Sequence, residues 1–153
     1  MLKTIIFMYF IPFFIYAQTV DITADNMKLD ENTHQIKFIG NAKVVQEKSY
    51  IYADTIIVYF NENNETKQYD AIGSVDFEFI KENSHYKGSS DKLTYKPIDT
   101  IYILKGHAKI KDIINKRFIK GDIITLNTQT GNAEVKGSRK KPVKFIFETE
   151  NKK

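Results

Sequence analysis

The sequence predicts an all-β protein built from four repeated β-hairpins. A small residue followed by Asp occurs four times, each time with a glycine further along the chain. These are Ala24-Asp25 with Gly40, Ala53-Asp54 with Gly73, Ser90-Asp91 with Gly106, and Gly121-Asp122 with Gly137. The distances from Asp to Gly are 15, 19, 15 and 15 residues, and successive glycines lie 33, 33 and 31 residues apart. A repeat of this length cannot bury its own hydrophobic face, so the units are expected to stack on one another.

Alternating hydrophobicity is the second observation that predicts strands. The first unit opens with Ile22-x-Ala24 and then Met27-x-Leu29, and the other units open in a similar way. A period of two residues is typical of a strand with one buried face. The phase shifts by one residue at each small-Asp pair, because Ala24 and Met27 are three positions apart. An extra residue at a fixed place in a strand indicates a β-bulge or a corner.

Polar turns followed by a returning strand are the third observation. The turns are expected at residues 30–33, 61–66, 96–99 and 127–132. Apolar residues stand four and two positions before each glycine. They are Ile36 and Phe38, Tyr69 and Ala71, Tyr102 and Leu104, and Ala133 and Val135. The hairpin is therefore the repeating element.

Three segments depart from the repeat. Gly88 occupies an apolar position, which predicts a weak or bulged opening strand in the third unit. Residues 138–142 are basic and replace the apolar pair after Gly137, so the array is expected to end there, before a last strand from Val143 to Phe147. The longer second turn contains Asn64-Glu65-Thr66, an N-glycosylation acceptor pattern.

Residues 1–17 have the layout of a cleavable signal peptide, with Lys3 before an uncharged apolar run that ends at Ala17. An uncleaved anchor is the alternative. Residues 18–153 are then long enough for one domain with its own core. The chain contains no cysteine, and an exported protein without disulfides suits a bacterial periplasm. The prediction is therefore a periplasmic protein.

Charge and motifs argue against several functional classes. The formal net charge of the full chain is +4, which is too mild to indicate nucleic acid as a partner. The four repeated aspartates are interpreted as elements of repeat geometry, bonded to backbone groups at the bulge. The three histidines show no ligand spacing, and no phosphate loop or catalytic signature is present. We therefore expect no metal, no cofactor and no enzymatic activity; an enzyme using the repeated aspartates is a weaker alternative.

Strand parity predicts a continuous apolar interior, in which several positions are aromatic. The candidate interior residues are Phe38, Val44, Ile56, Val58, Phe77, Leu93, Tyr95, Tyr102, Leu104, Ile110, Ile124 and Leu126. Ordinary core packing is one interpretation of these residues. The other is an apolar slot between two parted sheets, which suits an acyl chain because each buried methylene contributes about 0.8 kcal/mol. Most of the lysines are interpreted as a solvated outer face, and a minority as contacts for phosphate on a headgroup.

The segments Ile22-Thr-Ala-Asp25, Ile51-Tyr-Ala-Asp54, Phe38-Ile-Gly-Asn-Ala42 and Leu104-Lys-Gly-His-Ala108 resemble the OstA-like family over essentially all of residues 18–153. The resemblance implies a slightly opened, antiparallel β-jellyroll that holds the lipid A acyl chains of lipopolysaccharide. It further implies head-to-tail self-association, an inner-membrane partner, LptC, and an outer-membrane partner, LptD. The expected function is a non-enzymatic periplasmic lipopolysaccharide carrier. The alternative is a structural or adhesive β-repeat protein with a fully packed core.

Overall fold

The computed structural model describes residues 19–150, which form ten β-strands and no helix. The strands are β1 (Val20–Thr23), β2 (Asn26–Asp30), β3 (Gln35–Gln46), β4 (Ser49–Phe60), β5 (Thr66–Lys81), β6 (Ser84–Lys96), β7 (Ile101–Asp112), β8 (Arg117–Asn127), β9 (Ala133–Lys136) and β10 (Lys144–Phe147). The expected signal peptide, residues 1–17, lies outside the described residues. Within residues 19–150, no helix is available that would be long and apolar enough to cross a membrane.

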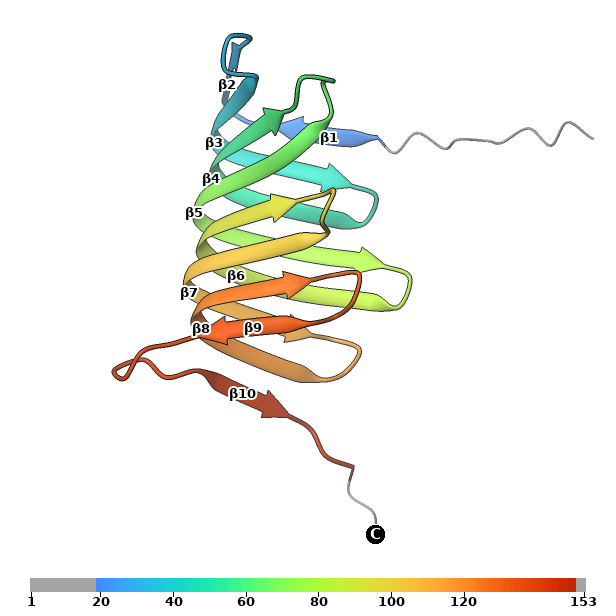
Figure 1. The fold of residues 1–153 in the computed structure, drawn as a ribbon, viewed down its shortest axis with the longest axis vertical. Coiled ribbons are helices and arrows are strands. Elements are labelled where there is room, and N and C mark those ends of the chain that lie inside the picture. The colour runs from blue at the N-terminus through green and yellow to red at the C-terminus, as the bar shows by residue number, and fades with distance from the viewer. Residues whose placement is uncertain (1–18, 151–153) are drawn as a thin grey trace, which may run out of the picture.

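All ten strands belong to one antiparallel sheet with the order β1-β3-β4-β5-β6-β7-β8-β10, while β2 also pairs with β3 and β9 with β8. Strands β3 to β8 are 11 to 16 residues long and bend near their middle, so each one crosses between two facing layers (Figure 1). We call the layer that contains β2 and β9 the first wall, and the layer that contains β1 and β10 the second wall. The predicted all-β architecture of repeated hairpins is confirmed.

The bend is a corner produced by the repeated glycine and aspartate. The pairing register shifts at the same level in successive strand pairs, for example between Ile39 and Ala42. Gly40, Gly73 and Gly106 have φ angles of 85°, 86° and 79°, which a side chain would disfavour. A Cβ atom on Gly73 would lie 2.3 Å from the Oδ2 atom of Asp54. Glycine is therefore required at this corner by both backbone conformation and close contact.

Asp25 and Asp91 contribute to the corner geometry, but each carboxylate contacts another side chain where the sequence predicted backbone groups. The amide of Asn41 donates to the carboxylate of Asp25 at 3.1 Å. The ring of His107 contacts the carboxylate of Asp91 at 2.8 Å. Each donor is the residue directly after the corner glycine, and both have positive φ angles. The corner is therefore fixed by a side-chain pair in the first and third units.

The core lies between the walls and is formed by the inward residues of β3 to β8. One row crosses the first wall near the corner, and its register joins Phe38, Ile56, Ala71, Leu93, Leu104 and Ile124. A facing row crosses the second wall through Val44, Ile51, Phe77, Gly88 and Ile110. Every residue of these two rows is buried except Gly88, which is half-buried. The interior is continuous from β3 to β8.

The prediction of a weak or bulged strand at Gly88 is wrong. Strand β6 is continuous from Ser84 to Lys96, and Gly88 pairs in register with Phe77 and Ile110. A Cβ atom on Gly88 would lie 2.3 Å from the ring of Phe77. The buried Phe77 ring thus fills the space beside the glycine, an arrangement known as aromatic rescue.

Both ends of the stacked repeats leave inward-phase apolar side chains uncovered. Met27 and Leu29 on β2 are 60% and 59% exposed, and Phe145 and Phe147 on β10 are 52% and 58% exposed. The basic segment from 138 to 142 separates β9 from β10, as predicted for the end of the array. The sheet is not closed, because the terminal strands of the two ends do not pair with each other.

Candidate functional site

On the side opposite the corner the hairpin turns form two columns (Figure 1), and we call this side the mouth. The first-wall turns span residues 31–34, 61–65, 97–100 and 128–132, and the second-wall turns span 47–48, 82–83 and 113–116. Between these columns lies a groove of about 660 Å³. This volume falls within the usual range for a small-molecule site.

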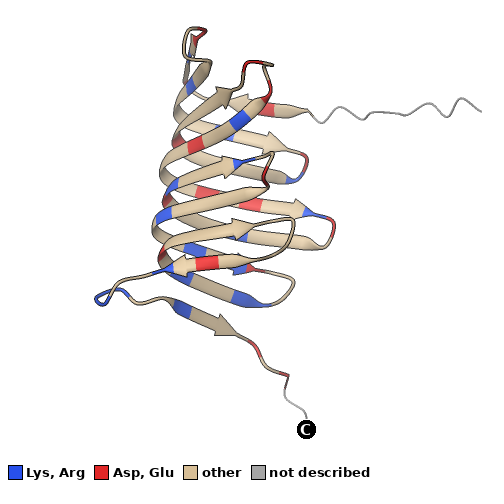
Figure 2. Ribbon diagram, in the orientation of Figure 1, with Lys and Arg blue, Asp and Glu red and all other residues tan. Residues whose placement is uncertain are grey.

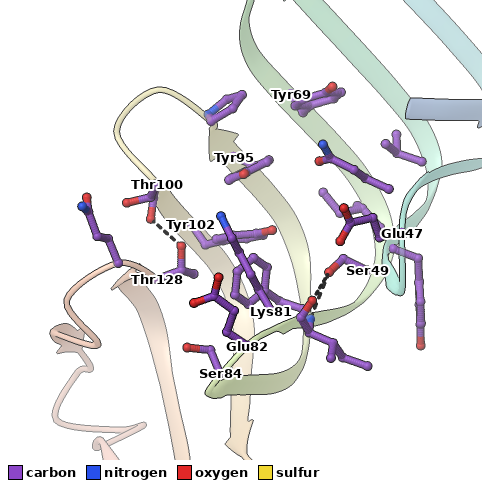
Figure 3. A pocket seen from close by; sticks show the side chains of 18 of the residues that line it. Glu47, Ser49, Tyr69, Lys81, Glu82, Ser84, Tyr95, Thr100, Tyr102 and Thr128 are labelled. Atoms are coloured by element: carbon purple, nitrogen blue, oxygen red, sulfur yellow. Dashed lines mark hydrogen bonds between the residues drawn. The ribbon is translucent and has the colours of Figure 1, made fainter. Parts of the chain in front are cut away.

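Three tyrosines on neighbouring strands form the aromatic floor of the groove. Tyr69 of β5, Tyr95 of β6 and Tyr102 of β7 are paired in register. Their rings stack in a column, with centroid distances of 5.9 Å for Tyr69–Tyr95 and 4.2 Å for Tyr95–Tyr102 (Figure 3). Phe79 reaches the column from the second wall, with its ring edge-on to Tyr102 at 5.8 Å. The two walls therefore meet through aromatic contacts at the floor.

The tyrosine hydroxyls are kept neutral. Burial is the main reason that the pKa of Tyr102 lies well above its usual value, and the neighbouring Tyr95 adds to the shift. Burial also raises the pKa of Tyr69 and Tyr95. The floor therefore presents uncharged rings with a polar hydroxyl at one end, a surface that contacts hydrocarbon and also offers hydrogen bonds.

The rim of the groove is polar. The Ser49 hydroxyl accepts a hydrogen bond from the Ile80 amide at 2.9 Å, which fixes two second-wall strands. On the first wall, the amide and the hydroxyl of Thr128 donate to the carbonyl of Thr100 at 2.9 and 3.1 Å. Charged rim residues are Glu47, Lys81 and Glu82 (Figure 3). An apolar floor under a polar rim matches the two parts of an amphiphile.

An ion pair between the buried Asp112 and the partly exposed Arg117 ends the aromatic surface toward the C-terminus. In the mouth-side row of the second wall, Phe79 and Tyr86 are followed in register by Asp112 and Arg117. Asp112 is 3% exposed and accepts hydrogen bonds from the Arg117 guanidinium, the shorter at 2.5 Å, and from Asn115. Burial opposes ionisation of Asp112, but the bonds from Arg117 and Asn115 outweigh it and lower the carboxyl pKa.

All twelve predicted interior residues face the space between the walls. Only Val44, Tyr95 and Tyr102 line the groove. The other nine are buried in the core between the walls: Phe38, Ile56, Val58, Phe77, Leu93, Leu104, Ile110, Ile124 and Leu126. The sequence pattern therefore predicts which face is inward without separating the groove from the packed core.

Several groove residues were missing from the predicted set. Tyr69 and Phe79 share the parity of predicted residues, Tyr69 four positions before Gly73 and Phe79 two after Phe77, so parity was a sufficient signal for both. The rim residues lie in turns or, like Ser49 and Lys81, at the ends of strands, and have no periodic signal. Among residues 19–150, no group of three side chains is placed to hold a metal ion.

The fold and groove define a class of protein, an open antiparallel β-jellyroll with an amphiphilic groove along one side. Residues 21–132 match the model of the family described as LptA/(LptD N-terminal domain) LPS transport protein. Because this match spans more than half of the sequence, the chain belongs to this family of lipopolysaccharide transport proteins. No curated protein sequence matches the chain.

A solved structure supports the same fold. The chain is similar to LptH, the LptA-homologous periplasmic component of the conserved lipopolysaccharide transport device from Pseudomonas aeruginosa, with a TM-score of 0.76 and 15% sequence identity. The similarity covers 86% of this chain and 96% of that chain. The β-jellyroll prediction and the resemblance to the OstA-like family are thereby confirmed.

Proposed function

We propose that this chain is a periplasmic carrier that shields lipid A acyl chains between its two walls. The observation that carries the proposal is the groove, whose floor is aromatic and whose rim is polar. The family to which the chain belongs transports lipopolysaccharide, an amphiphile with several acyl chains. In this proposal the chains lie on the tyrosine floor and the sugar headgroup lies at the rim.

The pattern of strand pairing allows the mouth to widen. Strand pairs join segments of the same wall, and the backbone hydrogen bonds between turns within residues 19–150 also stay within one wall. Spreading the mouth therefore separates side chains without breaking the sheet. An acyl chain inserted between Phe79 and Tyr102 replaces one apolar contact by another, and each of its methylenes removed from water contributes about 0.8 kcal/mol.

Photo-cross-linking from adjacent positions of one strand tests the carrier proposal. A photo-activated amino acid at Tyr102 or Leu104 faces inward, whereas one at Ile103 or Lys105 faces outward on the same strand β7. In cells that produce lipopolysaccharide, we expect adducts from the two inward positions and none from the outward pair.

Equal labelling of both faces, or no labelling from inside a folded protein, would contradict the carrier proposal. The second result would favour the structural or adhesive alternative with a fully packed core. Circular dichroism of each variant establishes that the protein is folded. Periplasmic fractions of the same cells show whether the protein is located there.

We further propose that the ends of the stacked repeats join copies of this chain head to tail, and join the array to LptC and LptD. The uncovered residues Met27, Leu29, Phe145 and Phe147 have the inward phase, so a second sheet at either end would extend the interior. Unpaired edge strands also favour pairing with another chain.

Sedimentation of the protein over a range of concentrations tests this assembly. We expect association that grows with concentration and weakens when residues from Val143 onward are deleted. A monomer at every concentration, or equal association of the truncated protein, would rule out pairing through β10.

A further inference from the structure

Five lysines gather on the outward side of the second wall, in its C-terminal half. They are Lys87 of β6, Lys109 and Lys111 of β7, Lys120 of β8 and Lys144 of β10. All five are exposed. Figure 2 shows blue segments on the lower strands of the rear wall, which is the second wall. We call these five residues the lysine face.

The sheet register places the lysines of this face directly opposite one another. Lys87 is opposite Lys111, Lys109 is opposite Lys120, and Lys120 is opposite Lys144. Like charges in directly opposed positions destabilise a sheet. Within residues 19–150, the single ion pair that involves this face joins Lys87 to Glu78 at 3.9 Å. The face therefore concentrates positive charge that the protein itself leaves almost unneutralised.

The same outward rows are different in the N-terminal half of the wall. There the register joins Lys43, Tyr52 and Asp76 in one row, and Val45, Tyr50 and Glu78 in the other. These positions hold charges of both signs and two aromatic rings, whereas the C-terminal half of the same rows holds the five lysines, Ser89, Phe118 and Ile146 and no carboxylate. The segregation of charge is thus a property of the C-terminal half and does not extend over the whole wall.

A shallow hollow of about 220 Å³ lies within the lysine face. Lys87, Lys109, Lys111 and Phe118 surround the chain at Gly88 and Ser89, with Asp76 at its edge. Ile146, 48% exposed, follows Phe118 in the same outward row. Lysines therefore extend over four adjacent strands, a width of roughly 15 Å at the usual strand spacing, and on β8 and β10 an apolar side chain lies beside them.

We propose that the lysine face binds the anionic headgroups of a lipid bilayer. Its lysines stand side by side on a sheet over several strands, so they match many phosphates in a plane better than one enclosed anion. Each lysine close to an anionic membrane surface adds a favourable contribution, and its alkyl stem can lie along apolar material while the ammonium reaches the phosphates. Phe118 and Ile146 would contact the interfacial region between headgroups.

Vesicle co-sedimentation tests the proposal. The purified protein is mixed with vesicles of phosphatidylglycerol and phosphatidylcholine, or of phosphatidylcholine alone. We expect binding to the anionic vesicles only, and loss of binding at high salt. The variant K87Q/K109Q/K111Q/K120Q/K144Q should lose affinity by about tenfold or more. The control K28Q/K37Q/K43Q/K48Q/K67Q removes the same charge from other exposed positions and should change affinity by less than about threefold.

Three results would overturn the proposal. They are no binding to anionic vesicles, equal losses in the two variants, or displacement by inorganic phosphate beyond that caused by sodium chloride of the same ionic strength. Displacement by inorganic phosphate would indicate a site for a soluble anion. No binding to anionic vesicles would favour an acidic protein as the partner. The five-lysine variant K87Q/K109Q/K111Q/K120Q/K144Q removes the repulsion between opposed lysines, so its melting temperature should stay the same or rise. Its loss of binding therefore cannot be attributed to unfolding. The smaller variant K109Q/K120Q provides a second measurement. Groove cross-linking is independent of this result.

Discussion

The corner and the mouth of this jellyroll are built by different parts of the same repeat. At the corner, the close approach of Asp to Gly recurs with nearly the same geometry in three units, since a Cβ atom added at Gly40, Gly73 or Gly106 would lie 2.3 to 2.5 Å from the aspartate Oδ2 atom. At the mouth, the position four residues before the glycine is Ile36, Tyr69, Tyr102 or Ala133. The conserved spacing within the chain therefore sets the fold, and the variable positions shape the groove.

Two phenylalanines on β5 provide the largest expected difference between these regions. Phe77 is fully buried and fills the space beside Gly88, whereas Phe79 is half-buried at the groove. We expect Phe77→Ala to lower the free energy of unfolding by about 3–5 kcal/mol and Phe79→Ala by about 1–2 kcal/mol. Urea denaturation of the two variants measures both effects. Equal losses would mean that the mouth is packed as tightly as the core.

Asp112 tests how a buried charge stabilises the mouth. Its carboxylate is held by Arg117 and Asn115, so Asp112→Asn should cost about 2–3 kcal/mol at neutral pH. The pKa of Asp112 is lowered below 3.8 in the folded protein, so its ionisation adds stability above that pH. This stability is lost as the pH falls through the lowered pKa.

The pH dependence of unfolding distinguishes the role of the charge from that of packing. Between about pH 4 and pH 2, the wild-type protein should lose more stability than Asp112→Asn does. If the free energy of unfolding falls equally with pH in the two proteins, the charge of the Asp112 carboxylate contributes nothing to stability.

The corner itself is tested by a glycine substitution and its control. Gly73→Ala places a Cβ atom 2.3 Å from the Asp54 carboxylate at a φ of 86°, and should cost about 2 kcal/mol. Gly131→Ala has a similar φ of 76°, but its nearest contact would be 3.8 Å away. The control should therefore cost about 1 kcal/mol, from backbone conformation alone. The double variant Gly73→Ala/Asp54→Ala removes the close contact but keeps the unfavourable φ. By thermal denaturation it should therefore regain only part of the stability lost in Gly73→Ala. A return to wild-type stability would contradict a cost from backbone conformation.

The sequence predicted the corner and the core better than the groove, for a physical reason. Strand parity and the Asp-Gly spacing are local and periodic, so they placed residues such as Phe38 and Leu104 on the inward face. Parity does not report how far apart two walls lie, and so Tyr102 in the groove and Leu93 in the core had the same signal. The Gly88 prediction failed because the compensating ring, Phe77, comes from a neighbouring strand.

The rim was beyond sequence reasoning because its residues meet only after folding. Thr100 and Thr128 are 28 residues apart and become hydrogen-bonded because β7 and β8 are adjacent. Ser49 and Ile80 are 31 residues apart and meet through the pairing of β4 with β5. Turn composition predicted where the chain reverses but not which turns would face one another.

The smallest expected effect comes from exchanging equivalent corner residues between units. His107 in the third unit has the place of Asn41 in the first, with φ angles of 48° and 46°, and each side chain contacts the aspartate beside its glycine. Asparagine adopts positive φ readily, and its amide can donate to Asp91 as Asn41 donates to Asp25. His107→Asn should therefore change the free energy of unfolding by less than about 0.5 kcal/mol. His107→Ala removes the donor from an exposed pair and should cost slightly more. If chemical denaturation shows that Asn is worse than Ala at this position, the corners of different units are not interchangeable, and the repeat would explain less of the fold than the Asp-Gly geometry indicates.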